Sequence, residues 1–292
     1  MWKRVSDLLG MIKFSHTLFA LPFAILGALL AASGPSGVRG GVREWVGILL
    51  CMATARSAAM AFNRLVDREF DAANPRTAGR HLPAGTLSVR SVAIFTVVNC
   101  VLFVGATSLF LPNRLPLILS IPVLLWLLGY SYAKRFTSLP HLWLGAALML
   151  APMSAWIALR GDFGWPPLWL GLAVLFWVTG FDVIYACQDE AHDRSVGLRS
   201  LPARLGARRA LRVAAMLHAA TVVCLVALWR VYPMGSIFLG AVALVALLLA
   251  YEHAIVRPDD LSRVNQAFFQ VNIAISIGLM IAGGLDLWAA AR

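Results

Sequence analysis

The feature that most constrains this chain is a series of apolar segments, each about as long as a membrane-spanning helix. The chain has 292 residues, of which 60% are hydrophobic and 13% charged, whereas a soluble domain is roughly half apolar and a quarter charged. A helix that crosses a bilayer needs about 20 mostly apolar residues. We therefore expect an all-α integral membrane protein, a single polytopic domain over 1–292, with about nine spanning helices. They are expected roughly at 14–34, 44–64, 91–111, 115–133, 141–159, 166–188, 210–230, 234–254 and 267–289.

The basic residues lie mainly in alternate connections between these segments. The net charge of +11 would suggest nucleic acid as the partner of a soluble protein, but membrane topology explains it better, and we expect no nucleic-acid partner. The N-terminus and the even-numbered loops with their flanks hold eighteen of the 25 Lys and Arg residues, six lie on the other side, and Arg56 is inside a span. The positive-inside rule then places the N-terminus in the cytoplasm and, after nine spans of the cytoplasmic (inner) membrane, the C-terminus outside.

Two groups of polar side chains lie where apolar segments end. The first acidic cluster is Asn63, Asp67 and Asp71, and the second acidic cluster is Asp182, Asp189 and Asp193. Residues four apart lie on one face of a helix, which applies to all of the first cluster and to the last two residues of the second. Asp182 precedes them by two turns and is expected deeper in the membrane. Charge near a bilayer is costly and usually functional.

Each cluster closes a long apolar segment and opens a long basic loop, which indicates a weak internal repeat. If the helices pack as a ring, the two clusters face each other across a central cavity at the cytoplasmic side. Oxygen ligands suit Mg²⁺, which commonly binds carboxylates together with substrate phosphates. Acids at helix ends are often only solvated caps, but two matched groups in the longest cytoplasmic connections favour a metal site.

Basic side chains accompany the acids and predict an anionic substrate. Arg56 precedes Asn63 by seven residues and shares its face, and an arginine inside a span needs a partner or a polar cavity. For most of the others, an anchor at the cytoplasmic surface is the simpler interpretation. Mg²⁺ with Arg and Lys suits the loss of a diphosphate, and a membrane site suits a substrate with a long hydrocarbon. The candidates in the cytoplasmic connections include Arg76, Arg80, Lys134, Arg135, Arg194 and Arg199.

With these motifs the chain resembles the UbiA superfamily of intramembrane prenyltransferases, particularly the 4-hydroxybenzoate polyprenyltransferase group. The match covers nearly the whole chain, and Lys13 and Thr17 agree loosely with its start. Arg64 departs from it, because many members have a second Asp there; we expect Arg64 to point sideways and metal binding to survive. The matching positions are Asn63, Asp67, Asp71, Arg76, Thr77, Arg80, Tyr132, Lys134, Arg135, Thr137, Asp182, Tyr185, Asp189 and Asp193.

The resemblance implies an enzyme that transfers a polyprenyl group from polyprenyl diphosphate to a hydroxylated aromatic carboxylate in ubiquinone or menaquinone biosynthesis, with Mg²⁺ as cofactor. Asp182 and Arg135 would be catalytic and would orient or activate the acceptor, which Arg56 and Tyr132 would bind. The implied metal ligands are Asn63, Asp67, Asp71, Asp189 and Asp193, and the implied diphosphate-binding residues are Lys134, Arg76, Arg80 and Arg194.

Two alternatives stay open. The runs at 11–22 and 56–63 resemble a branch associated with menaquinone made by the futalosine route, whose acceptor would be a dihydroxynaphthoate. A cation-coupled transporter also uses intramembrane acids, but near the midplane rather than at helix ends with arginines nearby. Neither the prenyl chain length nor the oligomeric state is indicated by the sequence.

Overall fold

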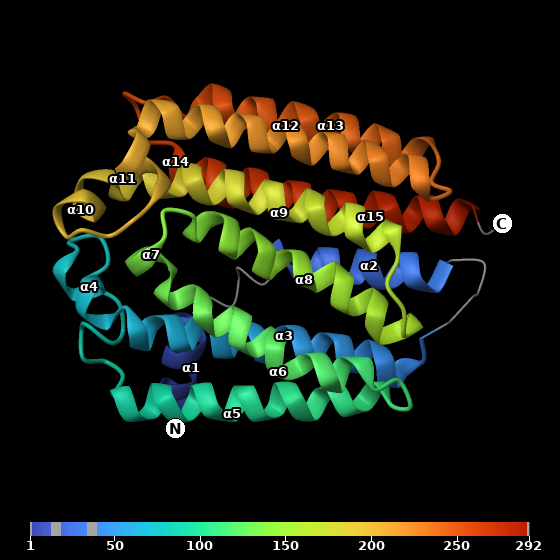
Figure 1. Ribbon diagram of the computed structural model, residues 1–292, viewed down its shortest axis with the longest axis horizontal. Helices are drawn as coiled ribbons and strands as arrows, with labels where there is room; N and C mark the ends of the chain where they lie inside the picture. The colour runs from blue at the N-terminus through green and yellow to red at the C-terminus, as the bar shows by residue number, and fades with distance from the viewer. Residues whose placement is uncertain (1, 13–18, 34–39, 291) are drawn as a thin grey trace. The chain divides into compact units, whose positions relative to one another are not determined.

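The structure of the protein is a computed structural model that describes residues 2–12, 19–33, 40–290 and 292. The described residues form helices joined by turns and one isolated bridge between Arg257 and Asp260 (Figure 1). Lys13 and Thr17 lie outside them. The helices are α1 Trp2–Met11, α2 Leu21–Ser33, α3 Val42–Val66, α4 Arg68–Ala73, α5 Val89–Thr107, α6 Leu115–Gly129, α7 Ala133–Phe136, α8 Pro140–Arg160, α9 Trp165–Ala186, α10 Glu190–Ser195, α11 Leu201–Leu205, α12 Ala207–Val231, α13 Ser236–Ile255, α14 Val264–Gln266 and α15 Asn272–Ala290.

Eight helices in the described part of the chain are long and apolar enough to cross a membrane. They match the predicted segments from 44–64 to 267–289. Two of them, Leu115–Phe136 and Trp165–Ser195, continue through short 3₁₀ turns into the next helix. The first predicted segment, 14–34, is described only in part, and α2 within it has 13 residues. The prediction of an all-α multi-pass membrane protein is confirmed, with eight such helices described against nine expected.

The chain divides into two compact units. Unit 1 comprises Met1–Thr17 and Gly41–Tyr132. In it α3 packs against α5 and α6. Met11 and Ile12, at the end of α1, are buried in a small core with Ala61 of α3 and residues of α5. The first acidic cluster therefore lies at the end of the best-packed helix of this unit.

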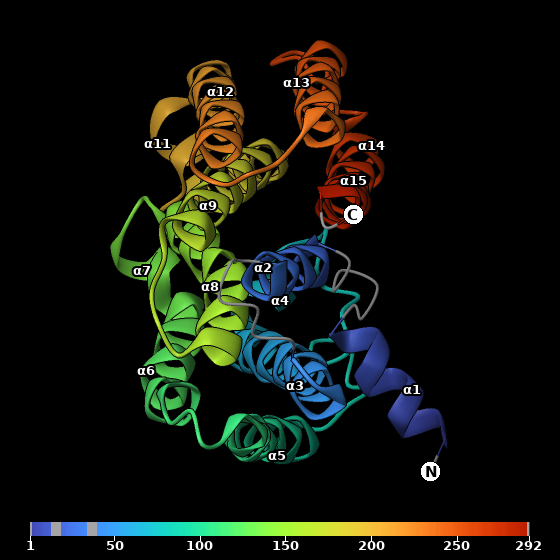
Figure 2. The ribbon, with the colours of Figure 1, turned by 90° about the vertical axis from the view of Figure 1, so that its right-hand side faces the viewer.

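Unit 2 comprises Leu18–Gly40 and Ala133–Arg292. Its central helix is α9, which packs between α8 and α12 (Figure 2). A Cβ atom on Gly145 of α8 would lie 2.4 Å from the carbonyl oxygen of Leu175, so only glycine permits this approach of α8 to α9, as is common between membrane helices. Asp182 is thereby carried on the helix with the most extensive packing in the unit. The prediction of one domain over 1–292 stays a prediction.

A buried polar network crosses the interior of unit 2. Trp177 Nε1 donates a hydrogen bond to Asn272 Oδ1 at 2.6 Å, and Asn272 Nδ2 donates to the carbonyls of Ala267 and Phe268, both at 3.2 Å. These carbonyls belong to a π-helical turn, Ala267–Val271. The turn brings the ring of Phe268 to 4.5 Å from that of Tyr185, centroid to centroid, and Tyr185 lies between Asp182 and Asp189 of the second acidic cluster.

Candidate active site

Each acidic cluster lies at a junction between a longer helical segment and a helix of six residues. Asp67 separates α3 from α4, and Asp189 separates the 3₁₀ turn after α9 from α10. Their backbone angles are alike, with φ −92° and ψ 5° at Asp67 and φ −102° and ψ 5° at Asp189. Asp71 and Asp193 both lie at the fourth position of the short helix. The local backbone is thus repeated, which supports the internal repeat expected from the sequence.

In the first acidic cluster the four-residue spacing brings two side chains into contact. The backbone N–H of Asp67 donates to the Asn63 carbonyl at 2.9 Å, and that of Asp71 donates to the Asp67 carbonyl at 2.8 Å. Asn63 Nδ2 donates to Asp67 Oδ2, also at 2.9 Å. The helical repeat therefore continues through the junction, and the expected shared face is present.

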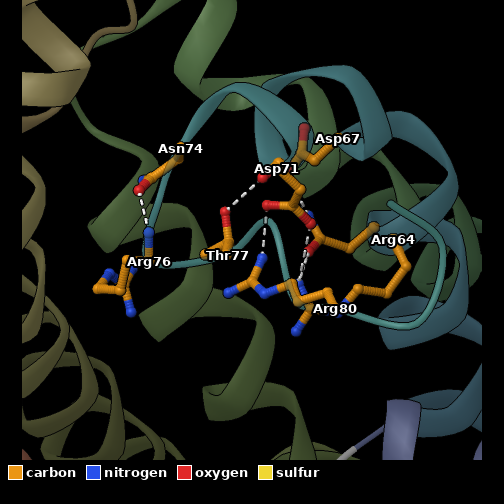
Figure 3. Close-up of polar contacts among 8 residues, drawn as sticks. Arg64, Asp67, Asp71, Asn74, Arg76, Thr77 and Arg80 are labelled. Carbon is orange, nitrogen blue, oxygen red and sulfur yellow. Dashed lines mark hydrogen bonds and ion pairs between the residues drawn. The ribbon is translucent and has the colours of Figure 1, made fainter. Parts of the chain in front are cut away.

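Asp71 is buried between two arginines. Arg80 donates from one terminal nitrogen to Asp71 Oδ1 at 2.6 Å, and a terminal nitrogen of Arg64 lies 3.8 Å from Oδ2 (Figure 3). The Thr77 hydroxyl donates to the Asp71 carbonyl at 3.0 Å. Oδ2 itself has no hydrogen-bond partner among the described residues. The carboxylate is thus hydrogen-bonded to Arg80 through Oδ1, while the buried Oδ2 faces Arg64 without a hydrogen bond.

The expectation that Arg64 points sideways is wrong. Its side chain is buried, lies 3.5 Å from Asn63 Oδ1 and reaches toward Asp71. Arg64 and Asp71 are seven residues apart, and the helical hydrogen bonds that continue through Asp67 keep the two residues close to one face. Arg80 meets Asp71 there from the turn that follows α4. Arg76 is exposed, and its backbone N–H donates to Asn74 Oδ1 at 2.9 Å. Of the two arginines in the turn 74–80, Arg80 contacts the first acidic cluster, through Asp71.

The two predicted acceptor-binding residues lie on different elements of unit 1. Arg56 is half-buried within α3, two turns before Asn63. Tyr132 ends the 3₁₀ turn after α6, and its ring meets that of Phe62 edge-on at 6.0 Å between centroids. Phe62 lies one turn before the end of α3, so Tyr132 packs against the last part of the helix that carries Asn63.

In the second acidic cluster Asp189 and Asp193 are both buried, Asp193 with only 2% of its surface exposed. The backbone N–H of Leu198 donates to the Asp193 carbonyl at 2.8 Å. Within the described residues Asp193 Oδ2 has no hydrogen-bond partner, which repeats the situation of Asp71. A buried carboxylate oxygen left in this state is costly unless a cation or a polar ligand reaches it.

Arg194 takes part in a local contact that the sequence interpretation missed. Its guanidinium donates to Glu190 Oε1 at 3.0 Å and to the carbonyl of Ala203 at 3.1 Å. Glu190 Oε2 accepts from the backbone N–H of Ala207, at the start of α12, at 2.8 Å. Arg194 therefore ties α10 to α11, and its diphosphate-binding role stays a prediction.

Lys134 and Arg135 lie on the single turn of α7, which the loop after α10 holds in place. The backbone N–H of Arg199 donates to the Lys134 carbonyl and its guanidinium donates to the Phe136 carbonyl, both at 2.8 Å. Lys134 is half-buried and Arg135 is exposed. Two predicted site segments of unit 2 are thus joined through backbone contacts, with Arg199 as the connecting residue.

Asp182 has a histidine partner. His141 Nδ1 lies 2.6 Å from Asp182 Oδ2, and His141 Nε2 lies 3.4 Å from the backbone N–H of Leu201. The signal for His141 was present in the sequence, since it is an ionisable residue at the start of an apolar span. Glu190 gave no such signal, and Arg199 was expected only as one of the basic residues around the site. The contacts of both depend on how the loop folds back.

No group of three His, Cys, Asp or Glu side chains in the described ranges is arranged to hold a metal ion alone. Each acidic cluster instead supplies three oxygen-bearing side chains, and one carboxylate oxygen in each is buried without a hydrogen-bond partner among the described residues. Mg²⁺ binds through one or two carboxylates, keeps several waters and takes substrate phosphates as further ligands. The donor set therefore suits a hard cation that arrives with an anionic substrate.

Comparison with known proteins agrees with these motifs. The model of the UbiA prenyltransferase family matches residues 20–274. The 4-hydroxybenzoate octaprenyltransferase of Vibrio cholerae serotype O1 is 32% identical over 259 residues, which cover 87% of this chain and 88% of the relative. The 4-hydroxybenzoate octaprenyltransferase of Nitrosomonas europaea is 33% identical over 235 residues, covering 80% of this chain and 77% of the relative.

Solved structures give the same result. A UbiA homologue from Aeropyrum pernix K1 in the apo state has a TM-score of 0.82 at 32% identity, covering 95% of this chain and 98% of that one. A UbiA homologue from Archaeoglobus fulgidus bound to GPP and Mg²⁺ has a TM-score of 0.71 at 19% identity, covering 97% and 99%, and shares the fold. The comparisons give no support to a transporter. The chain belongs to the UbiA prenyltransferase family.

Proposed function

We propose that this protein transfers a polyprenyl group from a polyprenyl diphosphate to a hydroxylated aromatic carboxylate, with 4-hydroxybenzoate as the acceptor. The observation that carries the proposal is that each acidic cluster contains a buried carboxylate oxygen without a hydrogen-bond partner, Asp71 Oδ2 and Asp193 Oδ2. Arginine and lysine side chains accompany both clusters. The names of relatives at about 30% identity support the choice of acceptor.

The residues present fit Mg²⁺ as the cofactor. Both oxygens without partners belong to the predicted ligand set, and oxygen ligands are those that Mg²⁺ prefers. When bound, Mg²⁺ neutralises the negative charge that develops on the departing diphosphate. The residues that would hold it are Asn63, Asp67, Asp71, Asp189 and Asp193.

We assign the diphosphate to the basic side chains Lys134, Arg76, Arg80 and Arg194. Arg80 has the clearest geometry, because one terminal nitrogen is fixed on Asp71 and the guanidinium carries further N–H donors. An arginine held in this way loses little freedom when it binds phosphate oxygens bidentately. Lys134, on the turn held by Arg199, adds a compact charge.

The acceptor is assigned to Asp182 and Arg135, which orient or activate it, and to Arg56 and Tyr132, which bind it. An arginine suits the acceptor carboxylate because the guanidinium matches two oxygens at once. A carboxylate at Asp182 suits the hydroxyl as a hydrogen-bond acceptor. The two ends of the acceptor would thus be recognised by groups of opposite charge.

In the reaction, the bond between the allylic carbon and the diphosphate oxygen breaks, and its electron pair leaves with the diphosphate. A ring carbon of the acceptor, made electron-rich by the hydroxyl, attacks the allylic cation and forms the new C–C bond. Loss of the proton from that ring carbon restores aromaticity. Water would capture the cation, so an apolar surrounding protects it.

We further propose that both clusters lie at the cytoplasmic side of the membrane, with the N-terminus in the cytoplasm and the C-terminus outside. The excess of Lys and Arg in the connections on that side supports this orientation. A cytoplasmic site gives the water-soluble acceptor direct access, while the donor's hydrocarbon remains in the bilayer.

The test is an assay with competing acceptors. Membranes that contain the protein receive a polyprenyl diphosphate, Mg²⁺ and either 4-hydroxybenzoate or a dihydroxynaphthoate. A prenylated hydroxybenzoate is the expected product. Product from the naphthoate alone would move the assignment to the menaquinone branch, which the run Arg56–Asn63 favours. No product with either acceptor from folded protein would reject the proposal.

A further inference from the structure

Asp182 has one hydrogen-bonded side-chain partner among the described residues, and it is His141. The Nδ1–Oδ2 distance of 2.6 Å is that of a strong, charge-assisted bond. His141 is the second residue of α8, while Asp182 lies near the end of α9. The bond therefore joins two long helices of unit 2 at their adjacent ends.

The contacts of the imidazole determine which nitrogen carries the proton. The backbone N–H of Leu201 is a donor and points to Nε2 at 3.4 Å, so Nε2 must accept. In the neutral ring the proton then resides on Nδ1, which donates to Asp182 Oδ2. Asp182 is accordingly an acceptor, with its Oδ2 fixed by the histidine.

The two side chains differ in their access to solvent. The His141 side chain is 2% exposed, whereas the Asp182 side chain is 18% exposed. A pair that only tied two helices together would have no need of an accessible carboxylate. The imidazole lies behind Asp182, and the carboxylate presents its accessible side to whatever enters the site.

The same histidine also reaches the loop that follows the second acidic cluster. Leu201 begins α11, and the preceding Arg199 holds the turn that carries Lys134. His141 thus lies between Asp182 and the loop that fixes a predicted diphosphate-binding residue. The Nε2 contact is made with the backbone of Leu201, whereas α7 is held by Arg199 itself.

We propose that His141 is a positioning residue that holds Asp182 as a hydrogen-bond acceptor for the hydroxyl of the aromatic substrate. The inference rests on the proposed function. His141 fixes one carboxylate oxygen through Nδ1–H, so the other oxygen meets the substrate hydroxyl at a defined angle. Hydrogen bonding there raises the electron density of the ring that attacks the allylic cation. His141 therefore affects how the aromatic substrate is used and does not affect how the polyprenyl diphosphate binds.

The experiment compares three variants, each of which keeps a different part of the imidazole. His141→Asn places an amide nitrogen one bond beyond Cγ, as Nδ1 is, and keeps the donor to Asp182. His141→Gln places its amide one bond further, near Nε2, and keeps only an acceptor for Leu201. His141→Leu removes both. Steady-state kinetics are measured for the wild type and each variant, with acceptor and donor varied separately and thermal unfolding of each protein recorded.

We expect kcat/KM for 4-hydroxybenzoate to fall roughly 10- to 100-fold in His141→Gln and His141→Leu, the loss associated with one hydrogen bond to a charged group. His141→Asn should stay within about threefold of the wild type, and the KM for the polyprenyl diphosphate should not move in any variant. Wild-type acceptor kinetics in His141→Leu would overturn the inference. Equal losses of kcat/KM in all three variants would also overturn it, as would a parallel rise in the KM for the polyprenyl diphosphate. Either result would mean that His141 only holds α8 and α9 together. An inactive wild type would reject the proposed function itself.

Discussion

The ion pair between Asp71 and Arg80 should contribute a large coupling free energy to the stability of unit 1. The magnitude of this free energy can be worked out from the geometry of the pair. The donor and acceptor atoms are 2.6 Å apart, and the side chains are 9% and 27% exposed. With the charge centres about 4 Å apart and an effective dielectric constant of about 20, the attraction is about 4 kcal/mol. Desolvation and the partial exposure of Arg80 reduce the net coupling to about 2 kcal/mol.

A double-mutant cycle measures this value. Asp71→Asn, Arg80→Gln and the double variant are unfolded reversibly in mixed micelles, and the coupling free energy is the departure from additivity. A chelator is present throughout, so that a bound cation contributes nothing. The cycle also separates Arg80 from Arg64, which is 3.8 Å from the same carboxylate and remains in all four proteins.

The neighbouring pair Arg68–Glu69 serves as the matched control. It is an adjacent ion pair at 3.3 Å in the same region, but its side chains are mostly exposed, so its cycle should show no measurable coupling. A coupling at Asp71–Arg80 below about 0.5 kcal/mol, or no larger than that of the control pair, would refute the argument that burial makes this contact strong.

Three further outcomes are expected. Asp67→Ala and Asp189→Ala should each abolish product formation while the protein still inserts into membranes, as followed by activity and membrane fractionation; near-normal turnover in both would remove the metal-site argument. Removal of divalent cations by a chelator should stop turnover, and added Mg²⁺ should restore it; activity that persists in the chelator would contradict the cofactor assignment. Asp286→Ala should cost about 1–2 kcal/mol in unfolding measurements, because both carboxylate oxygens accept backbone N–H groups at the start of α13. Asp259→Ala, at an exposed carboxylate, is its control and should leave unfolding unchanged.

The spanning helices and the acidic spacing were predictable because each depends on local sequence. An apolar run of about 20 residues has few alternatives to a membrane helix. Likewise, acids four apart share a helix face whatever surrounds them. Asn63 and Asp67 accordingly meet as expected, and Asp71 and Asp193 take equivalent positions in their short helices.

The two missed contacts have different causes. Arg64 was expected to point sideways from Asn63, but it is seven residues before Asp71, and the helical hydrogen bonds through Asp67 keep this pair on one face. His141 and Asp182 are 41 residues apart and meet only because α8 and α9 pack closely. Helical periodicity describes one helix at a time, so it gives no information on such pairings.

Unit 2 is built from two separate stretches of the chain, and this has a consequence for its synthesis. Its α2 is made early, yet it packs against α8 and α15, which follow much later in the chain. A Cβ atom on Gly27 of α2 would lie 2.7 Å from Pro152 Cα of α8, so the contact is close. At about 5–20 residues per second the ribosome needs on the order of ten seconds to reach α8.

During that interval α2 has no partner within its own unit. We therefore expect a nascent chain stopped before α8 to leave the face of α2 around Gly27 uncovered, so that a label placed there reacts more readily than in the complete chain.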